Sequence, residues 1–253
     1  MKIAVVTGAS SGMGREFVFA LDRAEPFDEI WVIARREDRL AALQQNCRAA
    51  IRPLPLDLLA PDALTSYAAL LKEHRPEVAV LVNASGFGRF ALFAEEPLAA
   101  YNDMLDVNAK ALMGMTYVTL PYLQSGGRIY QLGSLSSFQP VPYIAVYGAS
   151  KAFVLSFSRA LNVELRPRGI RSMAVCPGWV KTEFFDHALT DQTAVTYFNR
   201  FYTPEAVVRR AIKDMARGKD VSIAGFPVRF QVLLTKILPH KFVMWVWMKQ
   251  QGH

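Results

Sequence analysis

The 253-residue sequence predicts an α/β fold with a doubly wound, mostly parallel sheet of about seven strands and helices on both faces. Short, nearly continuous apolar runs alternate with amphipathic helical segments, which is the pattern of a parallel sheet buried on both faces. The first apolar run leads into a glycine-rich turn and then a helix, as in the first unit of such a sheet. No repeat, linker or change in composition divides the chain, so we expect a single domain.

The strands are expected where the β-rich apolar runs occur. These runs are Ile3–Val6, Glu29–Ala34, Ile51–Pro55, Val78–Asn83, Arg128–Leu132, Ile170–Cys176 and Val221–Ala224. The main helical patterns are Arg15–Arg23, Arg36–Cys47, Pro61–His74, Tyr101–Leu123 and Val146–Leu165. We expect residues 1–225 to form the domain. Within it, residues 178–203 are aromatic and weakly periodic, which predicts a lid or substrate loop.

Composition and charge exclude several classes of protein. Apolar residues make up 52% of the chain and charged residues 20%, which suits a sizeable core and not a disordered chain. The net charge of +7 comes from scattered basic residues without a recognition motif, so we expect no nucleic-acid partner. The four histidines lie far apart and the two cysteines lack ligand spacing, so we expect no metal site. Two cysteines and a first strand with no signal peptide before it predict a cytoplasmic protein.

The turn after the first strand carries Gly8, Gly12 and Gly14. Glycines permit a tight turn and a close backbone approach to a ligand. The helix that follows directs free N–H groups and the positive end of its dipole at a phosphate. A glycine cluster alone also fits an ordinary loop. Its place between a strand and a helix favours a dinucleotide-binding turn.

A second group of residues could carry acid–base chemistry. Tyr147 and Lys151 are four residues apart in a helical segment, so their side chains share a face. A nearby cation stabilises a phenolate, and we expect Lys151 to lower the pKa of Tyr147 towards the range of general acid–base catalysis. Ser134 follows the expected strand 128–132, where its hydroxyl could polarise a carbonyl. A helix surface and a polar turn would explain each feature singly, but their combination favours a catalytic site.

In the order and spacing of these motifs, residues 1–225 resemble the short-chain dehydrogenase/reductase family, which implies a Rossmann fold. Two further motifs extend the resemblance. Asn83-Ala84-Ser85-Gly86 stands where the family usually has Asn-Asn-Ala-Gly, and Pro177-Gly178-x-x-x-Thr182 follows the sixth strand. The departures at Ala84 and Ser85 could alter cofactor affinity.

The resemblance implies roles for four catalytic residues. Tyr147 would exchange a proton with the substrate oxygen, and Lys151 would lower its pKa and bind the nicotinamide ribose. Ser134 would hold the substrate oxygen. Asn108 would support a water relay that replenishes the proton. The reaction implied is the interconversion of a carbonyl and a secondary alcohol.

The cofactor expected is NADP(H). In dinucleotide folds, an arginine at the end of the second strand accommodates the 2′-phosphate of NADP, and here that strand ends in Arg35 and Arg36, of which Arg35 is the better candidate. The resemblance adds Asp57 and Leu58 as adenine contacts. The complete expected cofactor site is Gly8, Ser10, Ser11, Gly12, Met13, Gly14, Arg35, Arg36, Asp57, Leu58, Asn83, Ala84, Ser85, Gly86, Tyr147, Lys151, Pro177, Gly178, Val180 and Thr182.

The expected substrate is a hydrophobic carbonyl compound or alcohol: a steroid-like, fatty-acyl or aromatic ketone. The aromatic residues that favour it are Phe87, Phe90, Phe93, Phe138, Tyr143, Trp179, Phe184, Phe185, Tyr197, Phe198, Phe201 and Tyr202. The same residues could instead form a lid core or an oligomer interface. The alternatives in function are a non-catalytic NADP-binding regulator and a membrane-surface lipid reductase.

Residues 226–253 form an apolar C-terminal extension. Its run Phe242–Met248 is too short to span a bilayer. The extension could pack on its own domain or on a partner subunit, contact a membrane surface, or cap the substrate cleft. The family resemblance also implies a homodimer or homotetramer, with the helices Tyr101–Leu123 and Val146–Leu165 at the interface.

Overall fold

The computed structural model describes residues 1–189 and 194–252, and it confirms the predicted fold class. Seven strands form one parallel sheet in the order β3-β2-β1-β4-β5-β6-β9. Because the order runs outward from β1 and β4, the switch point of the sheet lies between them. The strands are β1 Lys2–Thr7, β2 Glu29–Ala34, β3 Ala50–Pro55, β4 Glu77–Asn83, β5 Leu123–Leu132, β6 Arg171–Val175 and β9 Val221–Ser222.

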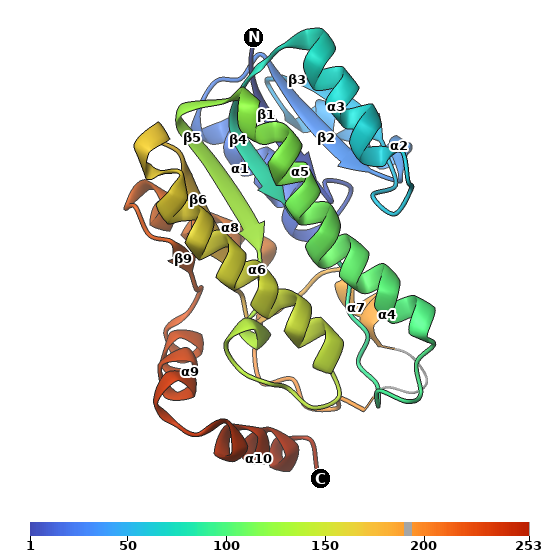
Figure 1. Cartoon of the computed structure of the whole chain (residues 1–253), viewed down its shortest axis with the longest axis vertical. Helices are drawn as coiled ribbons and strands as arrows, with labels where there is room; N and C mark the ends of the chain where they lie inside the picture. Colours follow the sequence, from blue (N-terminus) through green and yellow to red (C-terminus); the bar gives the residue numbers. More distant parts are fainter. Residues whose placement is uncertain (190–193, 253) are drawn as a thin grey trace.

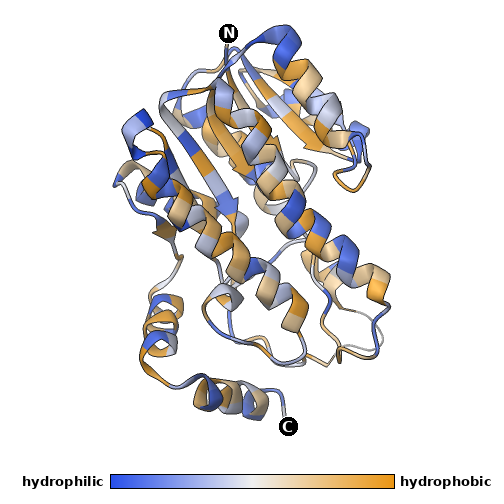
Figure 2. Cartoon of the chain, viewed as in Figure 1, coloured by the Kyte–Doolittle hydropathy of each residue, from blue (hydrophilic) through white to orange (hydrophobic). Residues whose placement is uncertain are grey.

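Helices cover both faces of this sheet (Figure 1). On one face lie α1 (Gly12–Ala24), α2 (Glu37–Ala41) and α8 (Pro204–Ala216). On the other lie α3 (Ala63–His74), α5 (Leu112–Thr119) and α6 (Ala145–Glu164). The central strands carry many hydrophobic residues (Figure 2), because each face of the sheet is buried beneath helices.

The strand β1 shows how the sequence pattern forms the two cores. Successive side chains of a strand point to opposite faces of the sheet. Ala4 and Val6 accordingly join the core beneath α1, whereas Ile3 and Val5 join the core beneath α3 and α5. All four are fully buried, so β1 lies at the centre of the molecule.

The helix expected over residues 101–123 is present as one unbroken helical run, but it begins at Leu98, contains a π-helical turn and ends at Thr119 (Figure 1). The run consists of α4 (Leu98–Leu105), a π-helical turn Asp106–Ala111 and α5, and the last residues expected for it belong to a 3-10 turn and to β5. Within the π-helical turn, the Asn108 side chain forms hydrogen bonds with the backbone of Phe87. The apolar periodicity of the sequence does not predict such a tertiary contact. Pro121 lacks a backbone N–H, and α5 ends just before it at Thr119.

Several other boundaries differ from the expected ones. The helix expected over residues 36–47 is α2 followed by a 3-10 helix, Ala42–Asn46. The strand β5 begins five residues before the expected Arg128, at Leu123. In the expected lid region, β7 (Trp179–Val180) pairs in parallel with β8 (Phe201–Tyr202), and α7 (Phe184–Ala188) lies between them. Residues 190–193 of that region lie outside the described residues.

The C-terminal extension is helical. It forms α9 (Phe226–Ile237) and α10 (His240–Gln250), which lie beyond the carboxyl ends of the strands, opposite the N-terminus (Figure 1). The indole N–H of Trp247 donates a hydrogen bond to the carbonyl of Pro142, 3.1 Å away, which ties α10 to the domain. Across the described residues, we find no helix with both the length and the apolar character needed to cross a membrane.

The end of the chain is also tied to the region after α7. The side-chain oxygen of Gln251 accepts hydrogen bonds from the backbone N–H groups of Thr196 and Tyr197, each 2.9 Å long. Gln251 is buried, so these bonds are shielded from solvent and hold the segment firmly.

Candidate active site

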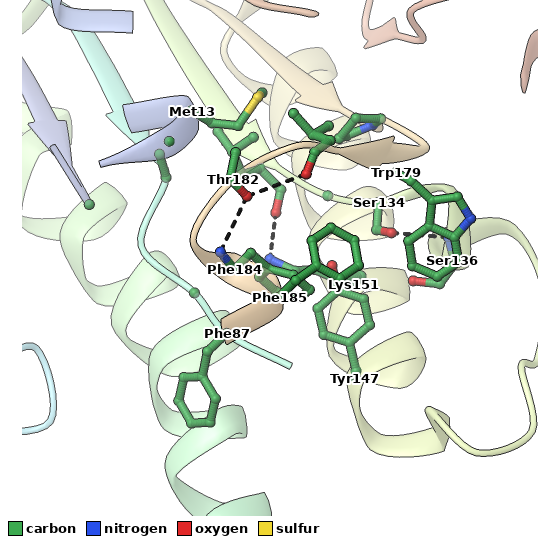
Figure 3. Close-up of a pocket in the computed structure, with 18 of the residues that line it drawn as sticks. Met13, Phe87, Ser134, Ser136, Tyr147, Lys151, Trp179, Thr182, Phe184 and Phe185 are labelled. Carbon is green, nitrogen blue, oxygen red and sulfur yellow. Dashed lines mark hydrogen bonds between the residues drawn. The ribbon is translucent and has the colours of Figure 1, made fainter. Parts of the chain in front are cut away.

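A cleft of about 760 Å³ opens at the carboxyl ends of the central strands, and Figure 3 shows part of its lining. The turns after β1, β2, β3, β4, β5 and β6 contribute to it, together with α6, α7 and the two C-terminal helices. All the residues that the sequence indicated for catalysis or cofactor binding line this cleft, except Asn83 and Asn108. The site therefore lies at the switch point of the sheet, where ligands of this architecture bind.

The glycine turn forms a cradle of bare backbone. Gly8 has a φ of 67°, and a Cβ there would lie 2.8 Å from the carbonyl carbon of Ala84. A Cβ on Gly14 would collide with the carbonyl of Gly8. The Thr7 hydroxyl accepts hydrogen bonds from the N–H groups of Ala84 and Ser85, at 3.0 and 3.1 Å, which joins the turns after β1 and β4. With the N-terminus of α1 behind it, this cradle fits the pyrophosphate of a dinucleotide.

The loop after β6 closes against the same turn. A Cβ on Gly12 would lie 3.2 Å from Cγ2 of Thr182, so the two segments are in direct contact. The N–H of Leu135 donates a 2.7 Å hydrogen bond to the carbonyl of Pro177, which links the turns after β5 and β6. The cleft is thus bounded by backbone segments that hold one another in place.

Positive charge gathers at the end of β2. Arg36 donates hydrogen bonds to the hydroxyls of Ser10 and Ser11, at 2.9 and 3.0 Å, and pairs with Glu183 at 2.9 Å. Arg39 also pairs with Glu183, at 2.7 Å. The two guanidinium groups hold the pKa of the Glu183 carboxyl below its usual value, with the hydrogen bond from Arg36 as the largest cause. The exposed side chain of Arg35 stands at the rim of the same cleft.

Tyr147, Lys151 and Ser134 meet in the cleft (Figure 3). Tyr147 and Lys151 lie one turn apart on α6, with the ammonium 5.7 Å from the centre of the tyrosine ring. Lys151 donates a 2.8 Å hydrogen bond to the carbonyl of Leu132 at the end of β5. Ser134 follows β5 and begins a 3-10 turn, in which its hydroxyl accepts the N–H of Ser136 at 3.2 Å. The helix α6 and the turn after β5 therefore hold the three side chains in place.

The electrostatics of this group differ from the sequence-based expectation. The Tyr147 ring keeps partial contact with solvent, but packing around it raises the pKa of the phenol to about 12, and the Ser134 side chain opposes this rise. Burial lowers the pKa of Lys151 to about 8. The expected lowering of the Tyr147 pKa is therefore not seen, because desolvation raises it by more than the Ser134 hydrogen bond lowers it. At neutral pH the phenol carries its proton and most of the lysine is charged.

An aromatic wall surrounds Tyr147. The ring of Phe90 is fully buried, with its centre 6.1 Å from that of Tyr147, 5.9 Å from Trp179 and 6.0 Å from Phe184. Figure 3 shows Phe184 and Phe185, from α7, beside the Tyr147 ring. Of the twelve aromatic residues named from the sequence, those that line the cleft are Phe87, Phe90, Trp179, Phe184, Phe185 and Tyr197. Phe93 instead stacks on Tyr101 outside it.

Comparison with known proteins identifies the family. The family model described as short chain dehydrogenase matches residues 2–193. The chain is a short-chain dehydrogenase. Sulfoacetaldehyde reductase 2 of Chromohalobacter salexigens is 36% identical over 188 residues, which are 72% of this chain and 74% of that protein. A protein of Myxococcus xanthus named as an uncharacterized oxidoreductase is 30% identical over 249 residues. The match covers 94% of this chain and 93% of that protein.

A solved structure shares the arrangement. The short-chain dehydrogenase from Sphingobium yanoikuyae in complex with NADPH aligns with a TM-score of 0.79 and 27% sequence identity, over 92% of each chain. The likeness therefore extends through nearly the whole molecule. It supports the fold and a nucleotide cofactor for this short-chain dehydrogenase.

Asn108 does not border the cleft of this dehydrogenase. Its side chain is fully buried, and its amide oxygen accepts the N–H of Phe87 at 3.1 Å while its amide nitrogen donates to the Phe87 carbonyl at 2.9 Å. The same nitrogen lies 3.1 Å from the hydroxyl of Ser150 on α6. Gly86 lies against the same side chain: a Cβ there would collide with the Asn108 amide oxygen and lie 3.3 Å from the Lys151 nitrogen. Asn108 thus fixes the chain after β4 against α6.

Asn83 also points away from the cleft. Its amide nitrogen donates to the side chains of Thr116 and Gln131, at 3.0 and 2.9 Å, inside the sheet–α5 interface. Gln131 in turn bonds the Thr116 hydroxyl at 2.9 Å, and all three residues are buried. The expectation of a direct cofactor contact by Asn83 does not fit this geometry. The residue instead holds the ends of β4 and β5 to α5.

Some residues of the cleft were not foreseen. Glu183 was missed because its partner Arg36 is 147 residues away in the chain. The helices α9 and α10 contribute Val228, Gln231, Trp247 and Gln250 to the lining. Capping of the cleft was one of the alternatives that the sequence left open for this extension.

Proposed function

We propose that this short-chain dehydrogenase is an NADP(H)-dependent oxidoreductase that interconverts a carbonyl and a secondary alcohol on a hydrophobic small molecule. The observation that carries the proposal is the convergence of Ser134, Tyr147 and Lys151 in one cleft with the glycine cradle at Gly8. A hydroxyl pair, a cation and an anion-binding turn are the groups that hydride-transfer chemistry requires of the protein.

The cofactor NADP(H), when bound, would supply or accept the hydride at the substrate carbon. The hydroxyls of Ser134 and Tyr147 would hold the substrate oxygen and stabilise the negative charge that develops on it. Tyr147 would then give its phenolic proton to that oxygen, which is far more basic than a phenolate. Its pKa of about 12 keeps the proton in place at neutral pH, so the resting tyrosine is ready for carbonyl reduction. Lys151 would stabilise the phenolate that remains.

Two residues support the preference for NADP(H). Arg35 and Arg36 both border the cleft after β2, where a guanidinium can bind the 2′-phosphate bidentately. The Sphingobium yanoikuyae relative is described in complex with NADPH, which agrees with this assignment. We therefore propose that the pyrophosphate lies on the glycine cradle and the 2′-phosphate beside these arginines.

The substrate wall supports a hydrophobic compound. Phe90, Trp179, Phe184 and Phe185 gather beside Tyr147, so a substrate whose carbonyl reaches Tyr147 must lie against aromatic rings. Such a wall favours a steroid-like, fatty-acyl or aryl ketone over a small charged aldehyde.

The experiment is NADPH consumption with a panel of steroid, long-chain acyl and aryl ketones, with sulfoacetaldehyde as a small charged comparison and NADH in parallel. We expect turnover of at least one apolar ketone, faster with NADPH. Turnover of sulfoacetaldehyde alone would contradict the substrate class. Tight NADPH binding without turnover of any carbonyl would favour the non-catalytic regulator.

The proposal extends to assembly and compartment. On α4, α5 and α6, exposed apolar side chains such as Leu105, Tyr117 and Phe153 favour a homo-oligomer through these helices. Cys47 and Cys176 are both free thiols, in agreement with a reducing cytoplasmic compartment. Sedimentation velocity of the purified protein tests the first statement.

A further inference from the structure

The helices α9 and α10, which lie at one edge of the molecule (Figure 1), carry several exposed apolar side chains. We call this surface the apolar face, and it consists of Phe226, Phe230, Leu233, Leu234, Ile237, Phe242 and Trp245. Its members on α9 recur every three or four residues and so form one stripe. Val228, Val232 and Thr235 on the same helix are buried. One side of α9 therefore packs on the domain while the apolar face is open to solvent.

The charge around the apolar face has a single sign. Residues 226–253 contain Arg229, Lys236, Lys241 and Lys249 and no Asp or Glu. None of these four basic side chains forms an ion pair with a carboxylate in the described part of the chain. The ammonium of Lys249 lies over the ring of Trp245, 5.0 Å from its centre. The surface thus combines exposed rings with uncompensated positive charge.

Charge complementarity selects the partner. If the apolar faces of two copies met, four basic groups of each would approach four of the other without a carboxylate from these helices between them. An anionic bilayer instead offers phosphates to the basic groups and an acyl boundary to the apolar side chains. We propose that the apolar face of α9 and α10 docks on an anionic membrane surface. The two helices would lie in the interface and would not span the bilayer.

The same helices connect this surface to the cleft. Val228 and Gln231 of α9 and Trp247 and Gln250 of α10 line the cleft from the inner side of the two helices. A docked molecule would therefore hold its cleft beside the bilayer. This consequence rests on the proposed function, because a hydrophobic substrate dissolved in the membrane would then reach Tyr147 with little exposure to water.

The test is co-sedimentation of the full chain with vesicles, without cofactor or substrate. Phosphatidylcholine vesicles that contain phosphatidylglycerol are compared with vesicles of phosphatidylcholine alone. We expect binding to the anionic vesicles that weakens as salt is added, and much weaker binding to the neutral ones. Lys236→Gln should weaken the binding about fivefold, since one basic residue near such a surface contributes about that factor. Lys110→Gln, in the π-helical turn that precedes α5, removes an exposed charge elsewhere and serves as the control. It should leave the vesicle binding unchanged.

The apolar contribution has its own matched pair. Ile237 and Leu98 are each 69% exposed, one in the apolar face and one on α4. Ile237→Ser should reduce binding to anionic vesicles by about tenfold, whereas Leu98→Ser should leave it unchanged. No sedimentation with anionic vesicles, or equal loss in both variants, would overturn the proposal. So would a change of oligomeric state in Ile237→Ser without vesicle binding, which would mean that a second copy covers the apolar face. Because the readout needs no turnover, it is independent of the proposed reaction.

Discussion

Arg36 and Glu183 form an ion pair of 2.9 Å between two sides of the cofactor cleft, although 147 residues separate them in the chain. Arg36 follows β2 and also bonds two hydroxyls of the glycine turn, whereas Glu183 directly precedes α7. The Glu183 carboxylate is therefore bound to one of the two guanidinium groups that we propose for the cofactor phosphate. Since α7 also carries Phe184 and Phe185, the pair connects the cofactor region to the substrate wall.

Replacement of Glu183 by Gln should tighten NADPH binding selectively. The carboxylate competes with the 2′-phosphate for Arg36, and a partly exposed ion pair is worth up to about 1 kcal/mol. We expect the Kd for NADPH to fall about two- to fivefold and the Kd for NADH to stay constant. Isothermal titration measures both, with Asp186→Asn on α7 as the control. Equal changes for the two nucleotides would rule out competition for the phosphate.

Arg35→Gln should weaken NADPH binding far more than NADH binding. A hydrogen bond to a charged group contributes roughly 1.5–3 kcal/mol, so the Kd for NADPH should rise about 10- to 100-fold. Arg23→Gln, an exposed arginine on α1, serves as the control. An unchanged ratio of the two Kd values would show that another residue, with Arg36 as the first candidate, holds the phosphate.

Tyr147→Phe should remove turnover and preserve cofactor binding. The phenol is the proton donor in the proposed reaction, and loss of a general acid costs about 10²- to 10⁴-fold in rate. The ring of the phenylalanine would keep its contacts with Phe90 and Phe184. Steady-state kinetics and NADPH titration give the two readouts, and Tyr117→Phe on α5 is the matched control. Near-normal turnover would eliminate Tyr147 as the acid.

Carbonyl reduction should decline above about pH 8. The pKa of Lys151 is lowered to about 8, so its ammonium is present below that pH and is lost above it. Tyr147 stays protonated across this range because its pKa is about 12. We expect kcat/KM to fall about tenfold per pH unit above the Lys151 pKa. In Lys151→Arg the charge persists and the decline should disappear, even if the rate is lower. A decline that survives this substitution would belong to another group.

Asn83→Leu should destabilise the fold without a comparable effect on NADPH affinity. The substitution removes a hydrogen bond to Thr116 and leaves the buried amide oxygen of Gln131 without its donor, at a cost of about 1–3 kcal/mol in the free energy of unfolding. Urea denaturation measures this loss, and Asn102→Leu on the exposed side of α4 is the control. A large loss of NADPH affinity at unchanged stability would restore Asn83 as a cofactor residue.

The sequence was sufficient for the sheet because strands depend on local pattern, whereas many of the expected site residues came from the resemblance to a family. Apolar runs fixed the strands, and the spacing of Tyr147 and Lys151 on one helix placed both side chains in the same cleft. Ser134 could be added because the carboxyl ends of parallel strands meet at one edge. The strand positions and the shared helix face of Tyr147 and Lys151 required no knowledge of distant contacts.

What the sequence could not provide depends on such contacts. The pairing of Glu183 with Arg36 brings together distant segments, and the π-helical turn at Asn108 follows from its bonds to Phe87. The prediction of a lowered Tyr147 pKa was wrong for a related reason. Spacing shows that Lys151 is near, but the desolvation that raises the pKa of Tyr147 comes from the packed surroundings as a whole.

The buried bonds of Gln251 have a practical consequence for anyone who prepares the protein. A purification tag fused after residue 253 would begin three residues from Gln251, whose side chain holds the backbone of Thr196 and Tyr197, and Tyr197 lines the cleft. Such a fusion risks altered kinetics that would be mistaken for a property of the enzyme. The N-terminus lies at the opposite end of the molecule (Figure 1), so a cleavable tag belongs there.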